Sequence, residues 1–379
     1  MLPFANLSFW EKETFLTNVD YLIIGSGIVG LSTAIHLKKK QPNKKVLILE
    51  RGYLPTGAST KNAGFACIGS ASELLDDLNH SSENEVFETV EKRWKGLLYL
   101  RQLLTDEAID FQKLGSHELF QANEKTLYNE CIEKLSFLNT SLEKITSIPR
   151  VFQTAPQHLV SSGMNGFQNA IFNAAEGQID TGKMMKSLVS LAQSLGVKIL
   201  NSIEVTHINT NEVVTNYGKI SFHKLAICVN GLAKQFLPNE DVAPARAQVV
   251  VTSPIKNLQP NGIYHFDKGY YYFRNIGNRI LFGGGRNLNF EAEETDELNT
   301  SDQIINHLSS LLETHILPNS AFTIEHQWAG TMGIGKTKAP IVKHLKDSIY
   351  CGVRLGGMGV AIGTIVGKDL SKLILDSTS

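Results

Sequence analysis

Tyr21-Leu22-Ile23-Ile24-Gly25-Ser26-Gly27-Ile28-Val29-Gly30 is the stretch that decides the fold. An apolar run breaks here into three glycines, and residues 31–37 continue with the spacing of a buried helix. A second apolar run, Val46–Leu49, ends in Glu50. Strand, glycine turn, helix, strand and acid in this order are typical of a dinucleotide-binding unit, whereas a glycine-rich turn in another α/β unit is the alternative.

Each conserved feature of such a unit has a physical role that a residue here can fill. Gly25 permits a tight turn, Gly27 lets the backbone approach a pyrophosphate, and Gly30 lets the helix pack closely on the strand. The free N–H groups at the helix start, from Ile28 on, favour phosphate. Glu50 lies about twenty residues beyond Gly30, where a carboxylate can accept both ribose hydroxyls.

Composition restricts the class of protein. The chain has 379 residues and a net charge of −1, which gives no electrostatic case for nucleic acid or an anionic membrane as partner. Its four cysteines form no CxxC pair and stand near no paired histidines, so we expect no metal site, no disulfide framework and a reducing, cytoplasmic location. No stretch reaches the ~18 apolar residues of a membrane span, and the start has no basic and apolar regions of a signal peptide.

The order of the remaining segments predicts an interrupted α/β domain. Residues 72–147 have helical periodicity, and a helix is expected to run from Thr181 through Leu195. Aromatic alternation between Val249 and Gly285 predicts an antiparallel sheet. The tail returns to α/β, with a strand over 349–353 and a helix over 360–375.

The turn Arg354-Leu355-Gly356-Gly357-Met358-Gly359-Val360 is the second informative place. Its glycines would bring backbone N–H groups at a helix start close to a ligand, and such an end stabilises negative charge on a reduced flavin. A plain strand-to-helix turn is the alternative. Residues 330–337 also match the P-loop pattern, but Pro340 follows where a P-loop needs a helix, so we interpret that match as coincidence.

Together these residues resemble the D-amino-acid oxidase, glycine oxidase and sarcosine oxidase family of FAD-dependent oxidoreductases. The resemblance runs from about Asp20 to Leu375 and includes the loop 57–65, the segment 179–182, the segment 243–248, Trp328-Ala329-Gly330 and the C-terminal turn. It implies a fold that is α/β (α+β overall), with a discontinuous Rossmann-like FAD-binding domain and a second domain built on a mixed or antiparallel substrate sheet. The expected FAD-binding domain comprises residues 1–75, 150–240 and 323–379, and the substrate domain comprises 76–149 and 241–322.

The resemblance also implies which residues contact FAD. These are Gly25, Ser26, Gly27, Ile28, Gly30, Glu50, Arg51, Ala58, Ser59, Thr60, Lys61, Asn62, Ala63, Gly64, Phe65, Val205, Gly231, Leu355, Gly356, Gly357, Met358, Gly359, Val360 and Ala361. The sarcosine-oxidase type ties FAD to a cysteine after the late strand, and residues 327–334 contain none, so we expect noncovalent FAD.

The substrate residues depart from the family pattern. Tyr271 aligns with a position that hydrogen-bonds substrate, with a structural cross-strand aromatic as the equal alternative. Met332 stands where glycine oxidase-like members carry an arginine that holds the substrate carboxylate, and the C-terminal turn has Gly357 and Ala361 where relatives carry further cations. A buried carboxylate needs a paired cation, so an apolar pocket indifferent to carboxylates is expected, unless Arg354 substitutes. Lys61, Arg246 and Arg274 are the other cations that could take this place.

The implied activity is hydride removal from the carbon next to the nitrogen of an amine or unusual amino acid, with oxygen or an electron carrier as acceptor. A flavin-dependent dehydrogenase of a hydroxy acid or glycerol phosphate, an NAD-dependent dehydrogenase and a noncatalytic flavin subunit remain as alternatives.

Overall fold

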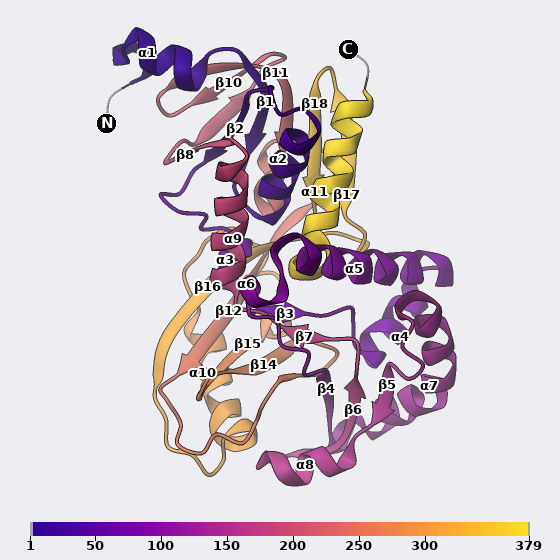
Figure 1. The fold of residues 1–379 in the computed structure, drawn as a ribbon. Helices are drawn as coiled ribbons and strands as arrows, with labels where there is room; N and C mark the ends of the chain where they lie inside the picture. The colour runs from indigo at the N-terminus through magenta and orange to yellow at the C-terminus, as the bar shows by residue number, and fades with distance from the viewer. Residues whose placement is uncertain (1–2, 378–379) are drawn as a thin grey trace.

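The computed structural model describes residues 3–377, and its two main sheets are stacked along one long axis (Figure 1). The strands of the first sheet are β1 (Val19–Ile24), β2 (Val46–Glu50), β8 (Lys198–Asn201), β9 (Val205–Ile208), β10 (Glu212–Thr215), β11 (Gly218–Ile227), β17 (Ile341–Lys346) and β18 (Ile349–Val353). The strands of the second sheet are β4 (Ser116–Gln121), β5 (Phe152–Thr154), β6 (Phe167–Asn173), β12 (Ala243–Thr252), β13 (Ile263–Phe266), β14 (Tyr271–Ile276), β15 (Arg279–Gly284) and β16 (Ile324–Ile334). A third, two-stranded sheet pairs β3 (Phe65–Ala66) with β7 (Gly177–Gln178).

The helices pack against these sheets. They are α1 (Phe9–Glu11), α2 (Ile28–Lys40), α3 (Ala58–Lys61), α4 (Ala71–His80), α5 (Glu83–Leu104), α6 (Asp106–Ile109), α7 (Lys125–Thr146), α8 (Pro156–Ser162), α9 (Thr181–Ser194), α10 (Asp302–Leu311) and α11 (Gly359–Asp376). No helix among residues 3–377 is both long enough and apolar enough to cross a bilayer.

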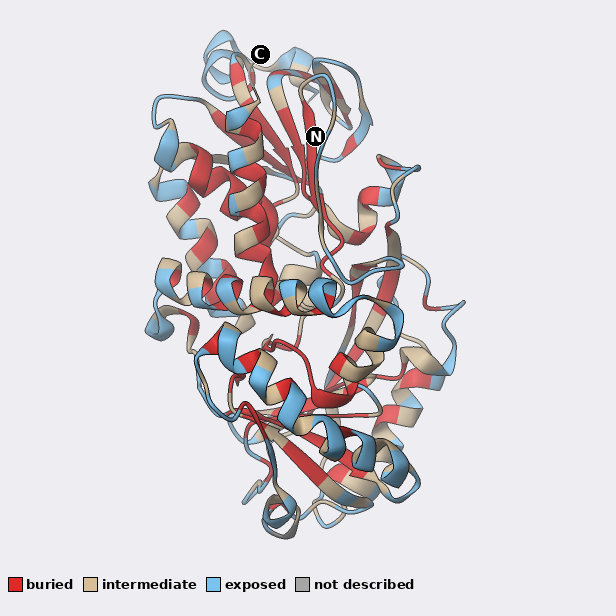
Figure 2. Cartoon of the chain, turned by 90° about the vertical axis from the view of Figure 1, so that its right-hand side faces the viewer, coloured by how far each residue is buried: buried red, intermediate tan, exposed pale blue. Residues whose placement is uncertain are grey.

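The first sheet is the predicted dinucleotide-binding sheet. Its path runs β17-β18-β11-β1-β2-β8, and β1 pairs in parallel with both β2 and β11. Every residue of β2 and β18 is buried, as expected for parallel strands covered on both faces. Strands and inner helix faces form the buried interior, while the outer helix faces are exposed (Figure 2). The α/β fold class, with a second mixed sheet, is thereby confirmed.

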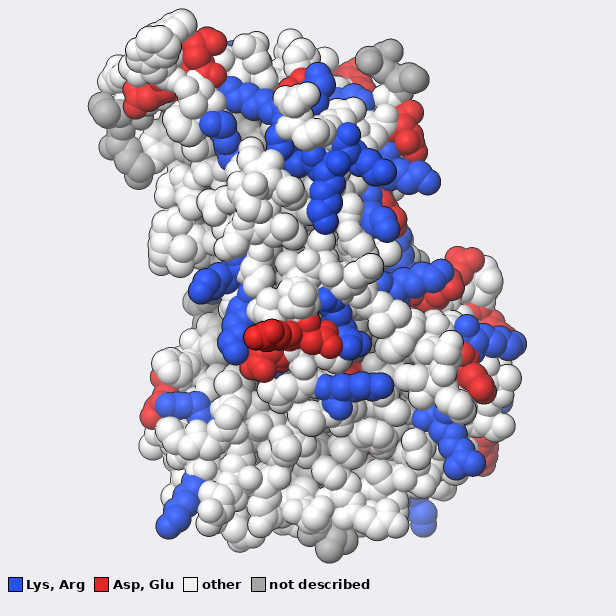
Figure 3. Space-filling model, viewed as in Figure 1, with Lys and Arg blue, Asp and Glu red and all other residues white. Residues whose placement is uncertain are grey.

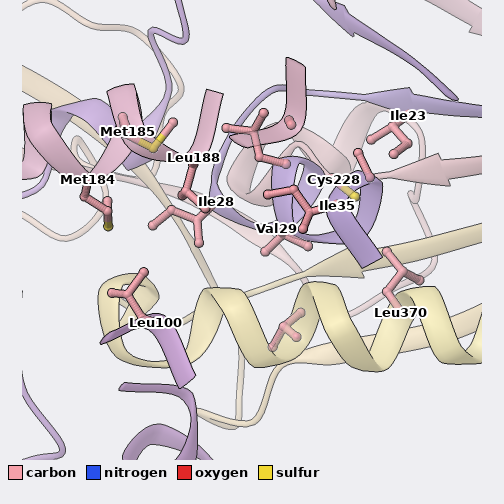
Figure 4. Close-up of a cluster of buried hydrophobic side chains, with 14 of the residues drawn as sticks. Ile23, Ile28, Val29, Ile35, Leu100, Met184, Met185, Leu188, Cys228 and Leu370 are labelled. Atoms are coloured by element: carbon pink, nitrogen blue, oxygen red, sulfur yellow. The ribbon is translucent and has the colours of Figure 1, made fainter. Parts of the chain in front are cut away.

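Helices from the two ends of the chain pack together beside this sheet. Val29 of α2 and Leu370 of α11 belong to one apolar cluster that also includes Leu100 of α5 (Figure 4). Close approach of α11 to α5 requires Gly96, because a Cβ there would lie 2.2 Å from the Ala361 carbonyl oxygen. Long-range packing of this kind positions the C-terminal turn beside the fingerprint.

One expectation about the elements was wrong. Residues 72–147 are not helical throughout, because β4 lies between α6 and α7 and pairs with β6 and β13. The polar residues of β4 do not show the alternation that predicts a strand. Glu118, for example, is buried, and it accepts a hydrogen bond from the Ser70 hydroxyl, at 3.0 Å, instead of facing water. The expected domain boundaries do not follow the sheets, because β5, β6 and β16 belong to the second sheet. The domain division itself stays a prediction.

Candidate active site

A cavity of about 650 Å³ lies between the first sheet and the second. Its walls come from the glycine fingerprint, the loop 57–65, the C-terminal turn and the facing strands of the second sheet. Segments far apart in the chain therefore form one continuous site. Figure 3 shows that lysine and arginine side chains gather on the part of the molecule that holds α2, away from the second sheet.

The glycine fingerprint forms the tight turn that its sequence predicts. Gly25 has a φ of +99°, and a Cβ there would lie 2.8 Å from the Cys228 carbonyl oxygen. A Cβ at Gly30 would lie 2.0 Å from the Gly25 carbonyl oxygen, so only glycine permits this packing of α2. Gly27 is the N-terminal flanking residue of α2, and the helix opens toward the cavity.

Glu50 closes the fingerprint at the end of β2. Its Oε2 accepts hydrogen bonds from the backbone N–H and the hydroxyl of Ser26, and its Oε1 accepts one from the Gly52 N–H at 2.9 Å. The side chain is buried and lines the cavity. A carboxylate has lone pairs for further donors, so Glu50 is oriented to accept ribose hydroxyls.

The loop 57–65 lies directly over the fingerprint. The Ser59 hydroxyl accepts a hydrogen bond from the Ile28 N–H, at 3.0 Å, and a Cβ at Gly27 would lie 2.9 Å from the same oxygen. Trp328 holds the loop from the second sheet, because its Nε1–H donates to the Lys61 carbonyl at 2.9 Å.

The C-terminal turn presents backbone at the start of α11. Gly356 and Gly357 have φ values of +57° and +80°, which favour glycine. The first N–H groups of α11 have no partner within the helix, and Gly359 and Val360, which bear two of them, line the cavity. An electron-rich ligand edge fits here.

Most of the predicted FAD-contacting residues line this cavity. They are Gly25, Gly27, Ile28, Glu50, Arg51, Ala58, Ser59, Lys61, Asn62, Ala63, Phe65, Val205, Leu355, Gly356, Gly357, Met358, Gly359 and Val360. The other six, Ser26, Gly30, Thr60, Gly64, Gly231 and Ala361, are not part of the cavity wall. Several of these six support the wall instead, as when Ser26 orients Glu50 and Gly30 seats α2.

The predicted role of Tyr271 is not supported by its position. Tyr271 is buried in the apolar cluster of the second sheet, and its hydroxyl lies 3.1 Å from His307 Nε2. Side chains alternate along a strand, and Tyr272 is the residue that lines the cavity. Its ring lies over Gly283, where a Cβ would be 2.6 Å from a ring carbon. The position of Tyr271 agrees with the structural alternative, a cross-strand aromatic, that the sequence left equal to the substrate role.

Three arginines considered as substrate cations form hydrogen bonds or ion pairs within the protein. Arg354 forms an ion pair of 2.6 Å with Asp241 and donates to the Ala339 carbonyl, so it is not in the cavity wall. Arg246 pairs at 2.6 Å with buried Glu293. Arg274 donates to the carbonyl oxygens of residues 64 and 179, and burial lowers its pKa to about 10.

Met332 lines the cavity, as predicted. A cation, Arg286, lies in the wall of the same cavity. Arg286 follows β15 and also lines the cavity, half-buried, with its guanidinium carbon 4.8 Å from the Phe290 ring centre. Within residues 3–377 this guanidinium makes no hydrogen bond or ion pair, and burial lowers its pKa. Sequence reasoning missed Arg286. Its only signal was its place directly after Gly283-Gly284-Gly285.

These residues fit a flavin dinucleotide. The glycines leave space at the fingerprint that a Cβ would fill, Glu50 is oriented for a ribose, and the start of α11 faces the cavity. The model for the family described as FAD dependent oxidoreductase, DAO, matches residues 20–373. The chain belongs to this family. The expected family and the FAD cofactor are therefore confirmed.

Known relatives match this chain over nearly its whole length. The probable oxidoreductase OrdL of Haemophilus influenzae is 22% identical over 96% of this chain and 84% of its own. The sarcosine oxidase subunit beta of Rhodobacter capsulatus is 23% identical over 96% of this chain and 88% of its own. The crystal structure of glycine oxidase from Geobacillus kaustophilus superposes with a TM-score of 0.74 at 17% identity and covers 95% of each chain, which shows the shared fold.

Proposed function

We propose that this FAD-dependent oxidoreductase oxidises an amine that bears a carboxylate, an N-substituted or otherwise unusual amino acid. Bound FAD supplies the chemistry by accepting a hydride from the carbon next to the nitrogen. The name of the relative from Rhodobacter capsulatus, sarcosine oxidase subunit beta, supports an amine substrate.

Arg286 is the single observation that supports a carboxylate on the substrate. A half-buried guanidinium without a hydrogen bond or an ion pair costs free energy, and a bidentate carboxylate is the ligand that suits it best. Arg286 therefore argues against the expected pocket that is indifferent to carboxylates. Apolar and aromatic side chains, Met332 and Tyr272, would hold the carbon skeleton and exclude water.

The protein's own contribution is then positioning and not proton transfer. Arg286 would bind the carboxylate, while Tyr272 and Met332 would limit where the carbon bearing the hydride can lie. The amine loses its proton to water, and the carbon–nitrogen double bond forms as the carbon–hydrogen bond breaks.

The electron acceptor, the attachment of FAD and the compartment are further parts of the proposal. We propose noncovalent FAD, and oxygen or an electron carrier as acceptor. Four buried free cysteines suit a reducing compartment such as the cytoplasm.

Anaerobic flavin bleaching tests this function. Purified holoenzyme is mixed with sarcosine against dimethylamine and with proline against pyrrolidine, pairs that differ in the carboxylate alone. We expect the carboxylate-bearing member to bleach the flavin at concentrations at least tenfold lower. Arg286→Met should remove that preference, whereas Arg279→Met at the other end of β15, a partly exposed arginine paired with Glu325, should keep it.

Other results would contradict the proposal. Bleaching by glycolate or glycerol phosphate but by no amine would favour the hydroxy-acid alternative. Bound FAD that no compound of either class reduces would favour a noncatalytic flavin subunit. A colourless protein that uses NAD would exclude the flavin altogether.

A further inference from the structure

The cavity has a second polar wall, built by Glu73 and His265. Glu73 lies in the first turn of α4, and His265 lies on β13; both line the cavity on the side of the second sheet. Neither residue belongs to the dinucleotide fingerprint or to the C-terminal turn.

Glu73 is held in place with one oxygen left free. Its Oε2 accepts the Ser70 N–H at 3.1 Å in a capping box. Its Oε1 makes no hydrogen bond within the described part of the chain. Gly269 makes room for this carboxylate, because a Cβ there would lie 2.9 Å from Oε1.

His265 is 94% buried, and its Nε2 has no hydrogen-bond partner among residues 3–377. It stands opposite Glu118 of β4 and Tyr272 of β14 in the sheet register. A buried ring nitrogen without a partner costs free energy. A ligand group in the cavity would satisfy it.

Acidic side chains lie behind this wall. Buried Glu118 and Glu176 lie behind Glu73, and the buried cation among them is Arg93. Lys268 and Lys338 also line the cavity, but they pair with Asp76 at 2.9 Å and with Asp77 at 2.6 Å. Burial raises the pKa of the Glu118 carboxyl, so Glu73 is the carboxylate that supplies negative charge at this wall.

Glu73 itself stays ionised. Burial raises the pKa of its carboxyl, but the positive charges of Lys338 and Arg93 and the hydrogen bond from the Ser70 N–H lower it further, so that the net shift is downward. A negative charge is therefore present at this wall at neutral pH.

We propose that Glu73 and His265 form a subsite for a protonated amine at the far end of the substrate, so that the oxidised amino acid carries a second, basic group. An alkylammonium has three donors. Glu73 Oε1 and the lone pair of His265 Nε2 can accept two of them. This inference rests on the proposed function, with Arg286 binding the carboxylate of the same substrate.

Matched substrates test the subsite by anaerobic bleaching of the holoenzyme. Lysine is compared with norleucine and ornithine with norvaline, in both enantiomers, because each pair differs only in the terminal amine. We expect the basic member to bleach at concentrations at least tenfold lower. Glu73→Gln, which keeps the capping box, should bring the ratio within each pair close to one, and so should His265→Gln.

The control is Glu85→Gln, the same change at the same capping-box position of α5, where the side chain is exposed. It should keep the preference. Calorimetry adds a readout independent of turnover: γ-butyrobetaine, whose quaternary nitrogen is a cation without N–H donors, is compared with its tert-butyl analogue, which keeps the carboxylate but lacks the positive charge. The cation should bind the wild type at least tenfold more tightly, and Glu73→Gln should remove the difference.

The outcomes separate the two proposals. If no amine bleaches the flavin, the proposed function fails. If amines bleach it but each pair behaves alike, or if Glu73→Gln leaves the preference intact, the subsite is wrong and the function stands.

Discussion

Glu50 accepts two hydrogen bonds from Ser26, one from its backbone N–H at 3.1 Å and one from its hydroxyl at 2.7 Å. Ser26 sits in the glycine turn after β1, and Glu50 ends β2, so these bonds join the carboxyl ends of adjacent parallel strands. The acid expected to bind ribose is therefore oriented by the turn expected to bind pyrophosphate. This coupling gives the first prediction.

Glu50→Ala should purify largely as apoprotein. Two charge-assisted hydrogen bonds contribute on the order of 3–6 kcal/mol, which corresponds to a loss of FAD affinity of a hundredfold or more. The ratio of flavin to protein absorbance measures it. Ser26→Ala, which removes only one orienting bond, should weaken FAD by less, and full occupancy in Glu50→Ala would rule out the ribose role.

Gly357→Val should displace the flavin while the fold survives. Gly357 has a φ of +80°, and a Cβ there would point at Met332 Sδ, 3.4 Å away. Left-handed backbone costs about 1–2 kcal/mol for a residue with a side chain, and a branched one also enters the cavity. Flavin occupancy and far-UV circular dichroism are the two measurements.

Two glycines serve as controls for Gly357. Gly277 has a φ of +56° in open space, so Gly277→Val carries the strain without reaching the site and should keep FAD. Gly359 has no left-handed φ, and a Cβ there would meet only the flexible end of Leu355 at 3.3 Å. Gly359→Ala should therefore be milder, and equal effects at all three positions would place the turn away from the ring.

Acid precipitation should release all the yellow colour into the supernatant. Cys67 and Cys228 are the cysteines that line the cavity, but both are buried, and burial raises the pKa of each thiol well above the usual range. A thiol that stays protonated is a poor nucleophile for attachment to a flavin. Colour that stays with the pellet would contradict noncovalent FAD, and peptide mapping would then locate the attachment.

Arg246→Met should destabilise the protein by about 3–5 kcal/mol, because it leaves Glu293 buried without its cation. Arg246 donates to both carboxylate oxygens of Glu293, and Gln248 donates to one of them. Urea unfolding measures the change. The double variant Arg246→Met with Glu293→Gln removes both charges and should recover most of the loss, and a double variant no more stable than the single one would contradict this account.

The sequence by itself predicted the dinucleotide-binding half well, because its signals are local. A tight glycine turn, a helix start and a strand-end acid lie within residues 21–50, and short-range sterics determine their geometry. The C-terminal turn was recognisable for the same reason. Cys228, by contrast, follows β11 and reaches this unit because β11 pairs in parallel with β1.

Tertiary structure determines which side chains face the substrate side of the cavity. Tyr271 and Tyr272 are adjacent in one aromatic run, and only the packing of β14 against its neighbours determines which ring faces the cavity. Arg286 is distinguished from Arg246, Arg274 and Arg354 because those three found partners in segments far away in sequence. Glu73 and His265 meet only because β13 pairs in parallel with β4, whose Glu118 binds the start of α4. The free energy that orients these side chains comes from long-range contacts, which no local pattern in the sequence records.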